Sequence, residues 1–494
     1  MNPRDERARL VLACVLATIA AGGDAALAAD SLVPKTLEQL PTPPTRQAAG
    51  RTGTARHLLA QSAGIRALHL CTGYFATPAP RSFTDAIAKT SASPIAPPDT
   101  QTQIDEEGRS VSVFYTEDLP PRIAVARPIL GCTLLPVGAA KSLSAGLPQP
   151  KAVVPNFDDQ PWPMGDRNAT ASLPARQRAA VESVIDEAFR DDKGAYRGIT
   201  WGVVVIRGGK IIAERYQYGF DLHRQARTNS MCKSIGGTLA GIGIHKGLLD
   251  LHRKAILREW RDRGDPRGEI TVNHLMQLSS GLYTESAGDR QSDIYGSGAA
   301  VSEAAALNVI EYKPGSHFVY AGADSLLLVR ALRQAVDDDE AFLTFPHREL
   351  LWKIGMTRTL VETDWKNDFV TSGQCWSTAR DFGRFGMLYL ADGVWQGERI
   401  LPKGWSTYVS TPAPGQSARE ASPRFGAQFW IYGGLAGLPE VAYSPNGSRG
   451  QYAMIIPSRD LVVVRRGFDA PSVDGREGFA IAKFSADVMN AVAE

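Results

Sequence analysis

The stretch that decides the fold is Thr228-Asn229-Ser230-Met231-Cys232-Lys233-Ser234, the start of a long apolar segment. Glycine and alanine recur in the residues that follow, and the pattern predicts a buried helix over residues 229–249. If Ser230 opens this helix, Lys233 lies one turn further along on the same face, within reach of the Ser230 hydroxyl. The helix dipole favours negative charge on the serine oxygen and, together with burial, lowers the pKa of the lysine. The motif therefore predicts a serine nucleophile, Ser230, with a neutral Lys233 as its base.

The same motif has a purely structural interpretation, in which Ser230 is a helix N-cap and Lys233 a solvated helix residue. Two observations favour the chemical one. This is the only Ser-x-x-Lys in the chain, and its lysine falls in an apolar helix, where a charge without a partner is costly. No serine is flanked as Gly-x-Ser-x-Gly, so the sequence offers no competing nucleophile elbow.

Hydrophobic periodicity around this helix predicts one antiparallel sheet assembled from both ends of a domain that begins near residue 166. We expect further helices over residues 173–189, 270–278, 324–335, 379–390 and 478–493. Hairpin strands are expected over residues 200–207 with 210–216, and over 451–456 with 461–466. The result is an α+β fold, in which an antiparallel sheet is flanked by helices and accompanied by an all-helical region.

The residues before 166 have a different character. Residues 1–28 combine early arginines, a short apolar run and Ala26-Leu27-Ala28, which is typical of a secretory signal peptide. Residues 29–165 carry Pro-rich patches and two strand-like runs, at 111–115 and 123–126, and we expect a small irregular N-terminal domain there. A second domain is expected over 166–494, since 494 residues exceed the size of one core.

A signal peptide implies export, to the periplasm or out of the cell, and export permits disulfides. Four cysteines remain after its removal, Cys71, Cys132, Cys232 and Cys375, and they allow three pairings. We favour Cys71–Cys132 because both residues fall in the N-terminal part. Four buried free thiols are the alternative.

The composition argues against several classes of function. With 54 Lys and Arg against 52 Asp and Glu the net charge is +2, and no basic run points to a nucleic-acid partner. No later run of about 18 apolar residues exists, so no stable membrane anchor is expected. The eight histidines lack metal-ligand spacing, and neither a metal nor an organic cofactor is expected. No pattern in the sequence indicates an oligomeric state.

Several motifs, in order, resemble those of the serine β-lactamase-like hydrolases, which include class C β-lactamases, esterases and 6-aminohexanoate-dimer hydrolases. The Ser230 segment resembles their S-M-x-K-S motif, and residues 270–282 resemble I-T-x-x-H-L-L-x-x-x-S-G-L. Residues 377–386 resemble S-T-A-R-D-L-A-R-F-G, and residues 447–451 resemble a G-x-x-G-Q strand. The resemblance covers about residues 175–494 and implies a penicillin-binding, transpeptidase-like fold. Cys71 and Cys132 lie in stretches that weakly resemble a segment preceding this domain in some members.

The resemblance also implies further site residues. Tyr320 takes the place of the family's second catalytic element, a tyrosine that relays protons, although a core tyrosine is the alternative. The backbone N–H groups of Ser230 and Ser448 would form the oxyanion hole, and Gly447 would let the backbone approach the substrate.

Beside them, Arg449 and Gly450 would complete the substrate-binding strand, with Arg449 facing a substrate carboxylate. A solvated strand residue is the alternative for Arg449. Gly322 stands where β-lactamases have an asparagine, and residues 445–447, Pro-Asn-Gly, stand where many relatives have K-T-G. Both differences argue against β-lactam specificity.

We therefore expect a serine hydrolase that cleaves an amide or ester bond of a small molecule through an acyl-enzyme, similar to the 6-aminohexanoate-dimer hydrolases. A β-lactamase or D-alanyl-D-alanine peptidase acting on cell-wall substrates is the enzymatic alternative. A non-catalytic module that binds peptidoglycan fragments is the alternative from another class. The presence of Ser230, Lys233 and Tyr320 argues against that module, because a binder has no need of a neutral lysine.

Overall fold

The computed structural model describes residues 55–77, 79–91, 101–283, 295–416, 423–469 and 478–493. The expected signal peptide, residues 1–28, lies outside these ranges. Within the described ranges, no helix has both the length and the apolar character needed to cross a bilayer.

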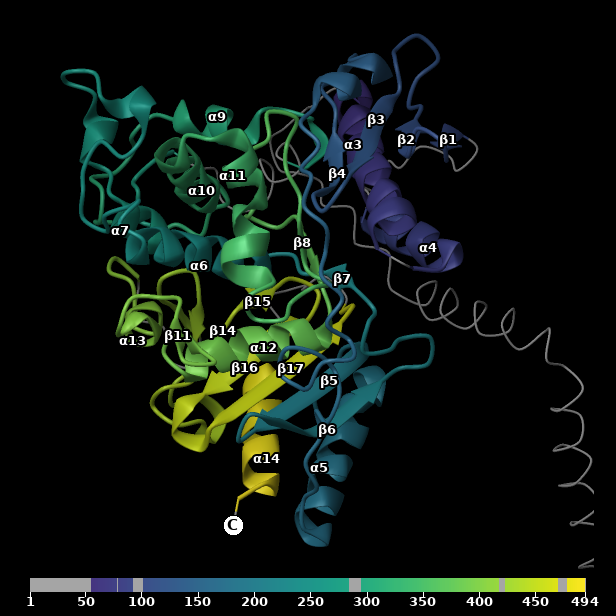
Figure 1. Ribbon diagram of the computed structural model, residues 1–494, viewed down its shortest axis with the longest axis vertical. Helices are drawn as coiled ribbons and strands as arrows, with labels where there is room; N and C mark the ends of the chain where they lie inside the picture. Colours follow the sequence, from purple (N-terminus) through teal and green to yellow (C-terminus); the bar gives the residue numbers. More distant parts are fainter. Residues whose placement is uncertain are drawn as a thin grey trace, which may run out of the picture.

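A large antiparallel sheet forms the base of the molecule (Figure 1). Its strand order is β12-β13-β14-β16-β17-β5-β6, so the first and last parts of the domain meet at the β17–β5 pair. The strands are β5 Thr200–Arg207, β6 Lys210–Tyr216, β12 Arg424–Phe425, β13 Trp430–Ile431, β14 Tyr443–Ser444, β16 Gln451–Ile456 and β17 Leu461–Gly467; β15 Asn446–Gly447 pairs with β16.

Helices cover both faces of this sheet, and the alternation of residues in β5 shows why. Val203 and Val205 pack with α5 Ala175–Ala188 and α14 Ile481–Ala491 on one face. Val204 and Ile206 pack on the other face, where α12 Ala379–Leu390 crosses the strands (Figure 1). The sequence of a strand that is buried on both faces is a nearly continuous apolar run, and the sequence of β5 has this character.

The all-helical region lies on the α12 side of the sheet around the buried helix α6 Met231–His245 (Figure 1). Its other helices are α7 Val272–Met276, α9 Val301–Ala306, α10 Ala323–Val336, α11 Asp339–Phe345 and α13 Trp405–Val409. A small sheet, ordered β7-β9-β8, joins this region to the large sheet, with β7 Ala226–Arg227, β8 Leu360–Val361 and β9 Cys375–Ser377. A short hairpin pairs β10 Val394–Trp395 with β11 Glu398–Arg399.

The observed architecture confirms the α+β prediction. Each predicted helix and hairpin has a counterpart among the elements above, and Thr271 caps α7 by accepting a hydrogen bond from the His274 N–H, as a helix start at that threonine requires.

The N-terminal unit, residues 55–134, is more regular than the irregular domain we expected. It contains α3 Ala55–Cys71, α4 Arg81–Ser91 and an antiparallel sheet of β1 Thr102–Asp105, β2 Ser110–Val113, β3 Arg122–Arg127 and β4 Gly131–Leu134. Helix α3 packs across β2, β3 and β4, and the unit lies against the helical region beside β7 and β8 (Figure 1). Residues 135–174 then run back to the large sheet, where Ile211 of β6 exchanges backbone hydrogen bonds with Ala169 and Ala171.

Candidate active site

Ser230 and Lys233 meet at the start of α6. Ser230 is the N-cap of this helix and is half-buried. Lys233 Nζ lies 3.2 Å from Ser230 Oγ and donates a hydrogen bond to the Ser372 carbonyl oxygen over 2.8 Å. The structure thus brings the two residues of the motif together on one turn of helix, as their spacing predicts.

The amine of Lys233 lies in a dry environment. The residue is only 2% exposed, and α6 is buried from Met231 to Gly243. Burial disfavours the charged form of an amine, and it lowers the pKa of Lys233 from 10.5 to about 7. We had expected both the helix dipole and burial to lower the pKa of the Lys233 amine. Burial by itself accounts for a pKa of about 7. An amine that is half neutral near pH 7 can accept the proton of a serine hydroxyl.

Tyr320 borders the same pair from the loop that precedes α10. Its hydroxyl lies close enough to Ser230 to interact with it, and Lys233 Nζ lies 5.0 Å from the centre of its ring. The rings of Phe425 and Trp430 pack against it at centroid distances of 5.7 and 5.3 Å. Burial raises the pKa of Tyr320 to about 12, so it keeps its proton at neutral pH.

The Gly447–Ser448 turn is held against the segment that carries Ser230. A β-carbon on Gly447 would lie 2.0 Å from the Thr228 carbonyl oxygen, so only glycine permits this approach. The Asn229 side-chain amide donates a hydrogen bond to the Ser448 carbonyl over 2.9 Å. These two contacts hold the backbone of Ser448 close to that of Ser230, as a two-amide oxyanion hole requires.

Arg449 and Gly450 follow this turn and differ in their surroundings. The Arg449 guanidinium lies 4.6 Å from the centre of the Phe468 ring, and burial, with a smaller effect of Arg227, lowers its pKa to about 10. A β-carbon on Gly450 would lie within 2.1 Å of both Arg465 and Asp469, a fully buried ion pair. This packing alone requires glycine at position 450, whatever the substrate.

Two disulfides are present. Cys71, at the end of α3, is bonded to Cys132 in β4, as predicted. Cys232 is bonded to Cys375 in β9, 143 residues away. We had not predicted this second bond, which ties Cys232, within the Ser230–Lys233 motif, to the small sheet.

Sequence reasoning also missed the residues behind Lys233. The loop before β9 supplies the Ser372 carbonyl, and Tyr295 donates a hydrogen bond from its hydroxyl to Ser372 Oγ over 3.0 Å. Arg227, the last residue of β7, donates from Nε to the Gly373 carbonyl over 3.2 Å. Arg227 was adjacent to the recognised motif in sequence, but neither Tyr295 nor Ser372 belongs to any motif.

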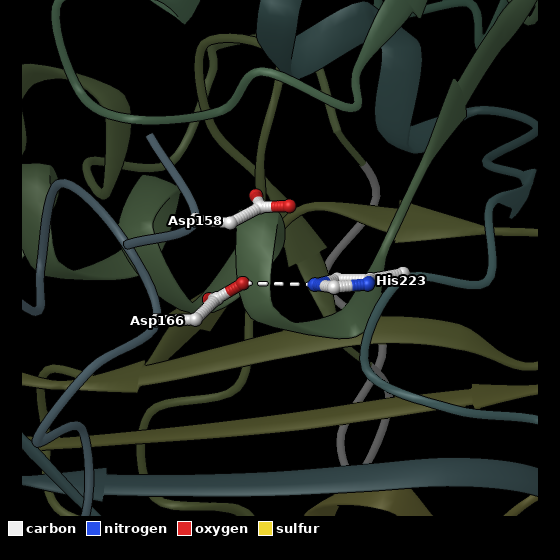
Figure 2. A group of neighbouring side chains, drawn as sticks. All are labelled: Asp158, Asp166 and His223. Atoms are coloured by element: carbon white, nitrogen blue, oxygen red, sulfur yellow. Dashed lines mark hydrogen bonds and ion pairs between the residues drawn. The ribbon is translucent and has the colours of Figure 1, made fainter. Parts of the chain in front are cut away.

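One group outside this site has atoms close enough to share a metal ion, among the residues described. Figure 2 shows Asp158, Asp166 and His223, whose ligand atoms lie within 4.8 Å of one another. These residues lie far apart in sequence, so no spacing pattern indicated them. Asp166 accepts a hydrogen bond from His223 Nε2 over 3.0 Å.

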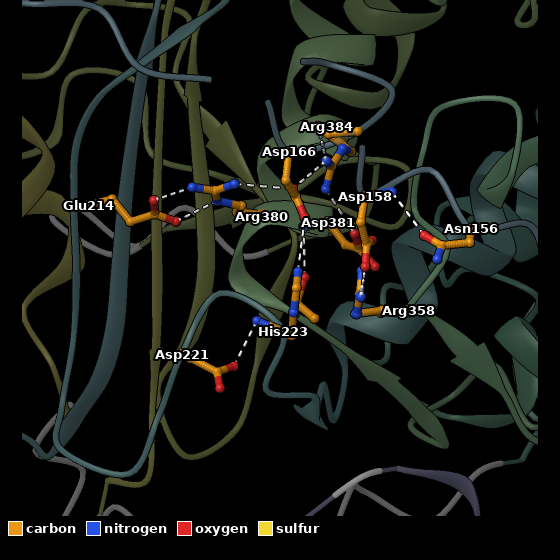
Figure 3. A network of polar contacts seen from close by, with 12 residues as sticks. Asn156, Asp158, Asp166, Glu214, Asp221, His223, Arg358, Arg380, Asp381 and Arg384 are labelled. Carbon is orange, nitrogen blue, oxygen red and sulfur yellow. Dashed lines mark hydrogen bonds and ion pairs between the residues drawn. The ribbon is translucent and has the colours of Figure 1, made fainter. Parts of the chain in front are cut away.

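Arginines already neutralise both carboxylates of this group (Figure 3). Arg358 donates two hydrogen bonds to Asp158, of 2.7 and 2.6 Å. Arg380 and Arg384 of α12 donate to Asp166 over 3.1 and 3.0 Å. Although burial opposes it, hydrogen bonding from His223 and the charge of Arg384 lower the pKa of Asp166 to about 2. Arg380 also donates to Glu214, and Arg384 to Asp381, so the three arginines are shared among four carboxylates. We assign this network a structural role in fixing residues 158–166 to Arg358 and to α12.

Comparison with known proteins agrees with the fold. The β-lactamase family model matches residues 185–465. No curated relative matches the chain.

Three solved structures are similar. A Bacteroides dorei protein assigned as a β-lactamase is 19% identical, with 63% of this chain and 98% of that one covered and a TM-score of 0.50. A family VIII carboxylesterase is 13% identical, with 65% and 98% covered and a TM-score of 0.50. A Bacillus anthracis protein assigned as a 6-aminohexanoate-dimer hydrolase is 20% identical, with 70% and 87% covered and a TM-score of 0.49. Since the family model spans more than half of the sequence, the chain belongs to the serine β-lactamase-like family.

Proposed function

We propose that this protein hydrolyses an amide or ester bond through an acyl-enzyme on Ser230. The observation that carries the proposal is the buried amine of Lys233, 3.2 Å from the Ser230 hydroxyl. A lysine that served only structure would be paired with a carboxylate or exposed, because burying a lone ammonium is costly. Burial alone lowers the pKa of Lys233, and no carboxylate of the described residues forms an ion pair with it.

The reaction would proceed in two halves. Ser230 Oγ attacks the carbonyl carbon while Lys233 Nζ accepts its proton, and the N–H groups of Ser230 and Ser448 stabilise the oxyanion. The proton then passes, with Tyr320 as the relay, to the leaving amine or alcohol, and the acyl-enzyme remains. A water molecule attacks the acyl carbon, gives its proton to the same pair, and Ser230 leaves with a proton restored.

The substrate class we favour is a small linear amide or ester similar to those of the 6-aminohexanoate-dimer hydrolases. Gly322 has no side chain to contact a substrate amide, and Pro445-Asn446-Gly447 has no cation in place of the lysine of K-T-G. Both features disfavour β-lactams. We also propose that the Arg449 guanidinium, which lies over the Phe468 ring beside the Gly447–Ser448 turn, contacts a substrate carboxylate.

We also propose that the protein acts outside the cytoplasm. Two disulfides support this, since such bonds form and persist in oxidising compartments. One of them lies within the catalytic motif itself, so correct assembly of the site would depend on an oxidising environment.

The test is covalent labelling with a fluorophosphonate and with a fluorescent penicillin, together with turnover of p-nitrophenyl esters. We expect the fluorophosphonate on the Ser230 peptide by mass spectrometry, ester turnover, and weak or absent turnover of a chromogenic cephalosporin. Ser230→Ala should abolish labelling and turnover without loss of folding. Ser234→Ala is the matched control, because its hydroxyl lies one turn along α6 and donates to the Gln428 carbonyl. Labelling that survives in Ser230→Ala would refute the assignment, and a folded wild-type protein with neither labelling nor turnover would favour the binding module.

A further inference from the structure

The Ser372 carbonyl fixes the direction of the Lys233 amine. A neutral amine has two N–H bonds and one lone pair, and only the lone pair can take a proton. One N–H donates to Ser372 over 2.8 Å, which leaves the rest of the group to face Ser230 Oγ at 3.2 Å. If the Ser372 carbonyl moved away, the amine would lose this orientation and water could reach it.

Two side chains hold the Ser372–Gly373 segment in place. The Tyr295 hydroxyl donates to Ser372 Oγ over 3.0 Å, and Arg227 Nε donates to the Gly373 carbonyl over 3.2 Å. The Arg227 guanidinium also lies 5.2 Å from the centre of the Tyr295 ring. A β-carbon on Gly373 would lie 2.6 Å from the Tyr295 hydroxyl, so the three groups are closely packed.

The N-terminal unit contacts the Arg227 side chain directly and the backbone of the residue that follows Tyr295. His69, near the end of α3, lies with Nε2 2.8 Å from Arg227 Nη1. Burial, and then the charge of Arg227, keep the pKa of His69 well below its usual value, so the imidazole is neutral. Because a guanidinium can only donate, His69 Nε2 accepts from Arg227. Arg122 of β3 donates to the Gly296 carbonyl over 2.7 Å, next to Tyr295.

The charged and titratable groups around this path are few in the described ranges. Tyr320 faces Lys233 directly, and Tyr295 faces it through Ser372. Behind Ser372 lie Arg227 and His69, and Arg449 lies close enough to Arg227 for the two charges to interact. Glu362 lies beyond them: it accepts hydrogen bonds from Thr72 of the N-terminal unit and from the Cys132 N–H, and burial raises its pKa to about 7.

We infer that the N-terminal unit is a positioning part of the active site, in which His69 holds Arg227, and Arg227 with Tyr295 holds the Ser372 carbonyl that orients Lys233. This role rests on the proposed function, because it acts on Lys233 as the base. It is distinct from mere stabilisation of the fold, because it predicts a change in the protonation of Lys233.

The experiment compares pH–rate profiles of the full-length protein on one p-nitrophenyl ester. His69→Leu keeps the bulk of the side chain but removes the acceptor for Arg227. With the Ser372 segment released and water admitted, the Lys233 pKa should rise, and we expect the acid limb of kcat/KM to move up by about one pH unit. The loss should be about tenfold at pH 6 and should shrink toward pH 9, since one pH unit of displacement leaves about tenfold less neutral amine.

Three further variants make the test specific. His69→Gln retains a side-chain acceptor and should restore the acid limb toward that of wild type. Tyr295→Phe, in the catalytic region, should shift the limb in the same direction and keeps the test valid if His69→Leu does not fold. Ser62→Ala is the matched control: Ser62 is fully buried two turns earlier on α3, and its hydroxyl makes no hydrogen bond within the described residues.

The outcomes separate the two proposals. An acid limb that stays in place in both His69→Leu and Tyr295→Phe, with activity lowered equally at every pH or unchanged, would overturn the positioning role while leaving the acyl-enzyme intact. A shift of equal size in Ser62→Ala would also overturn it. A wild-type protein that is neither labelled nor active would refute the proposed function and, with it, this inference.

Discussion

Replacing Lys233 by methionine should abolish activity and at the same time make the protein more stable at neutral pH. Methionine has a similar length and no charge, so it fits the buried site without an ammonium to desolvate. The Lys233 pKa is 10.5 without burial and about 7 in the folded protein, a difference worth about 5 kcal/mol at about 1.4 kcal/mol per pH unit.

The direction in which stability changes with pH depends on whether the folded or the unfolded state binds the Lys233 proton more tightly. Between pH 7 and 10.5 the unfolded chain holds the lysine proton and the folded protein does not, so in this range Lys233 makes stability rise with pH. Below pH 7 the folded protein carries the full penalty. At pH 7 itself the penalty is about 4 kcal/mol. Methionine removes it, but leaves the Ser372 carbonyl without its donor, at a cost of about 2 kcal/mol. The variant should therefore be about 2 kcal/mol more stable at pH 7.

The assay is denaturant unfolding of wild type and Lys233→Met at pH 6 and pH 9. The stability advantage of the variant should fall by about 3 kcal/mol between these values, because the wild type loses the lysine penalty above pH 7. Lys246→Met is the control, since Lys246 ends the same helix at the surface with Glu349 3.0 Å away, and its effect should not change over this range. Lys233→Arg should be inactive without gaining stability, because a guanidinium keeps its charge. An advantage that is absent at pH 6, or the same at pH 6 and 9, would refute the account of a buried neutral base.

Three other changes have outcomes that follow from the contacts described. Tyr320→Phe should retain the fold and lower kcat by about 10²–10⁴-fold, measured on the same ester, because it removes a proton relay beside Ser230. Replacing both Cys232 and Cys375 by alanine should lower the free energy of unfolding, measured in urea, by about 5 kcal/mol, because this bond closes a loop of 143 residues. The same change at Cys71 and Cys132 should lower it by about 4 kcal/mol, because that loop spans 61 residues. Asp166→Asn should lower the free energy of unfolding by about 2 kcal/mol at pH 7, because the pKa of Asp166 is 3.8 in the unfolded chain and about 2 in the folded protein. This contribution to stability is present above pH 4 and is lost as the pH falls through 2. Equal stability of Asp166→Asn and wild type at pH 7 would contradict it.

Local patterns were sufficient wherever a segment packs through apolar residues at regular spacing. The hairpin β5–β6 was predicted to the residue, since two apolar runs meet at Gly208-Gly209 and both glycines have positive φ. Helix α3 was missed for the opposite reason. It buries Gln61, Arg66 and His69 beside apolar residues such as Ala63, Ala67 and Leu70, so apolar and polar side chains are not separated onto two faces as in an amphipathic helix.

In the site, too, residues that belong to a local motif were predicted and residues outside any motif were not. Ser230, Lys233 and Tyr320 were identified because they belong to motifs that occur in a fixed order, and the structure brings them together. Their roles in catalysis remain a proposal. Tyr295 and Ser372 lie in no motif, because their contribution is a contact between loops that the sequence does not place side by side.

The cost of the buried base explains why so many covalent and polar constraints converge on one short segment. A lysine that favours water by several kcal/mol tends to open the structure around it until the amine is solvated. The Cys232–Cys375 bond opposes this directly, because it ties the turn that carries Lys233 to β9, whose preceding loop supplies the Ser372 carbonyl. Arg227 adds a second constraint from β7, paired with β9 in the small sheet. A buried amine that is neutral at pH 7, and so able to accept a proton, is thus stable only where the segments around it cannot separate. For this reason we expect changes far behind Lys233 to appear first in its titration and only later in the fold.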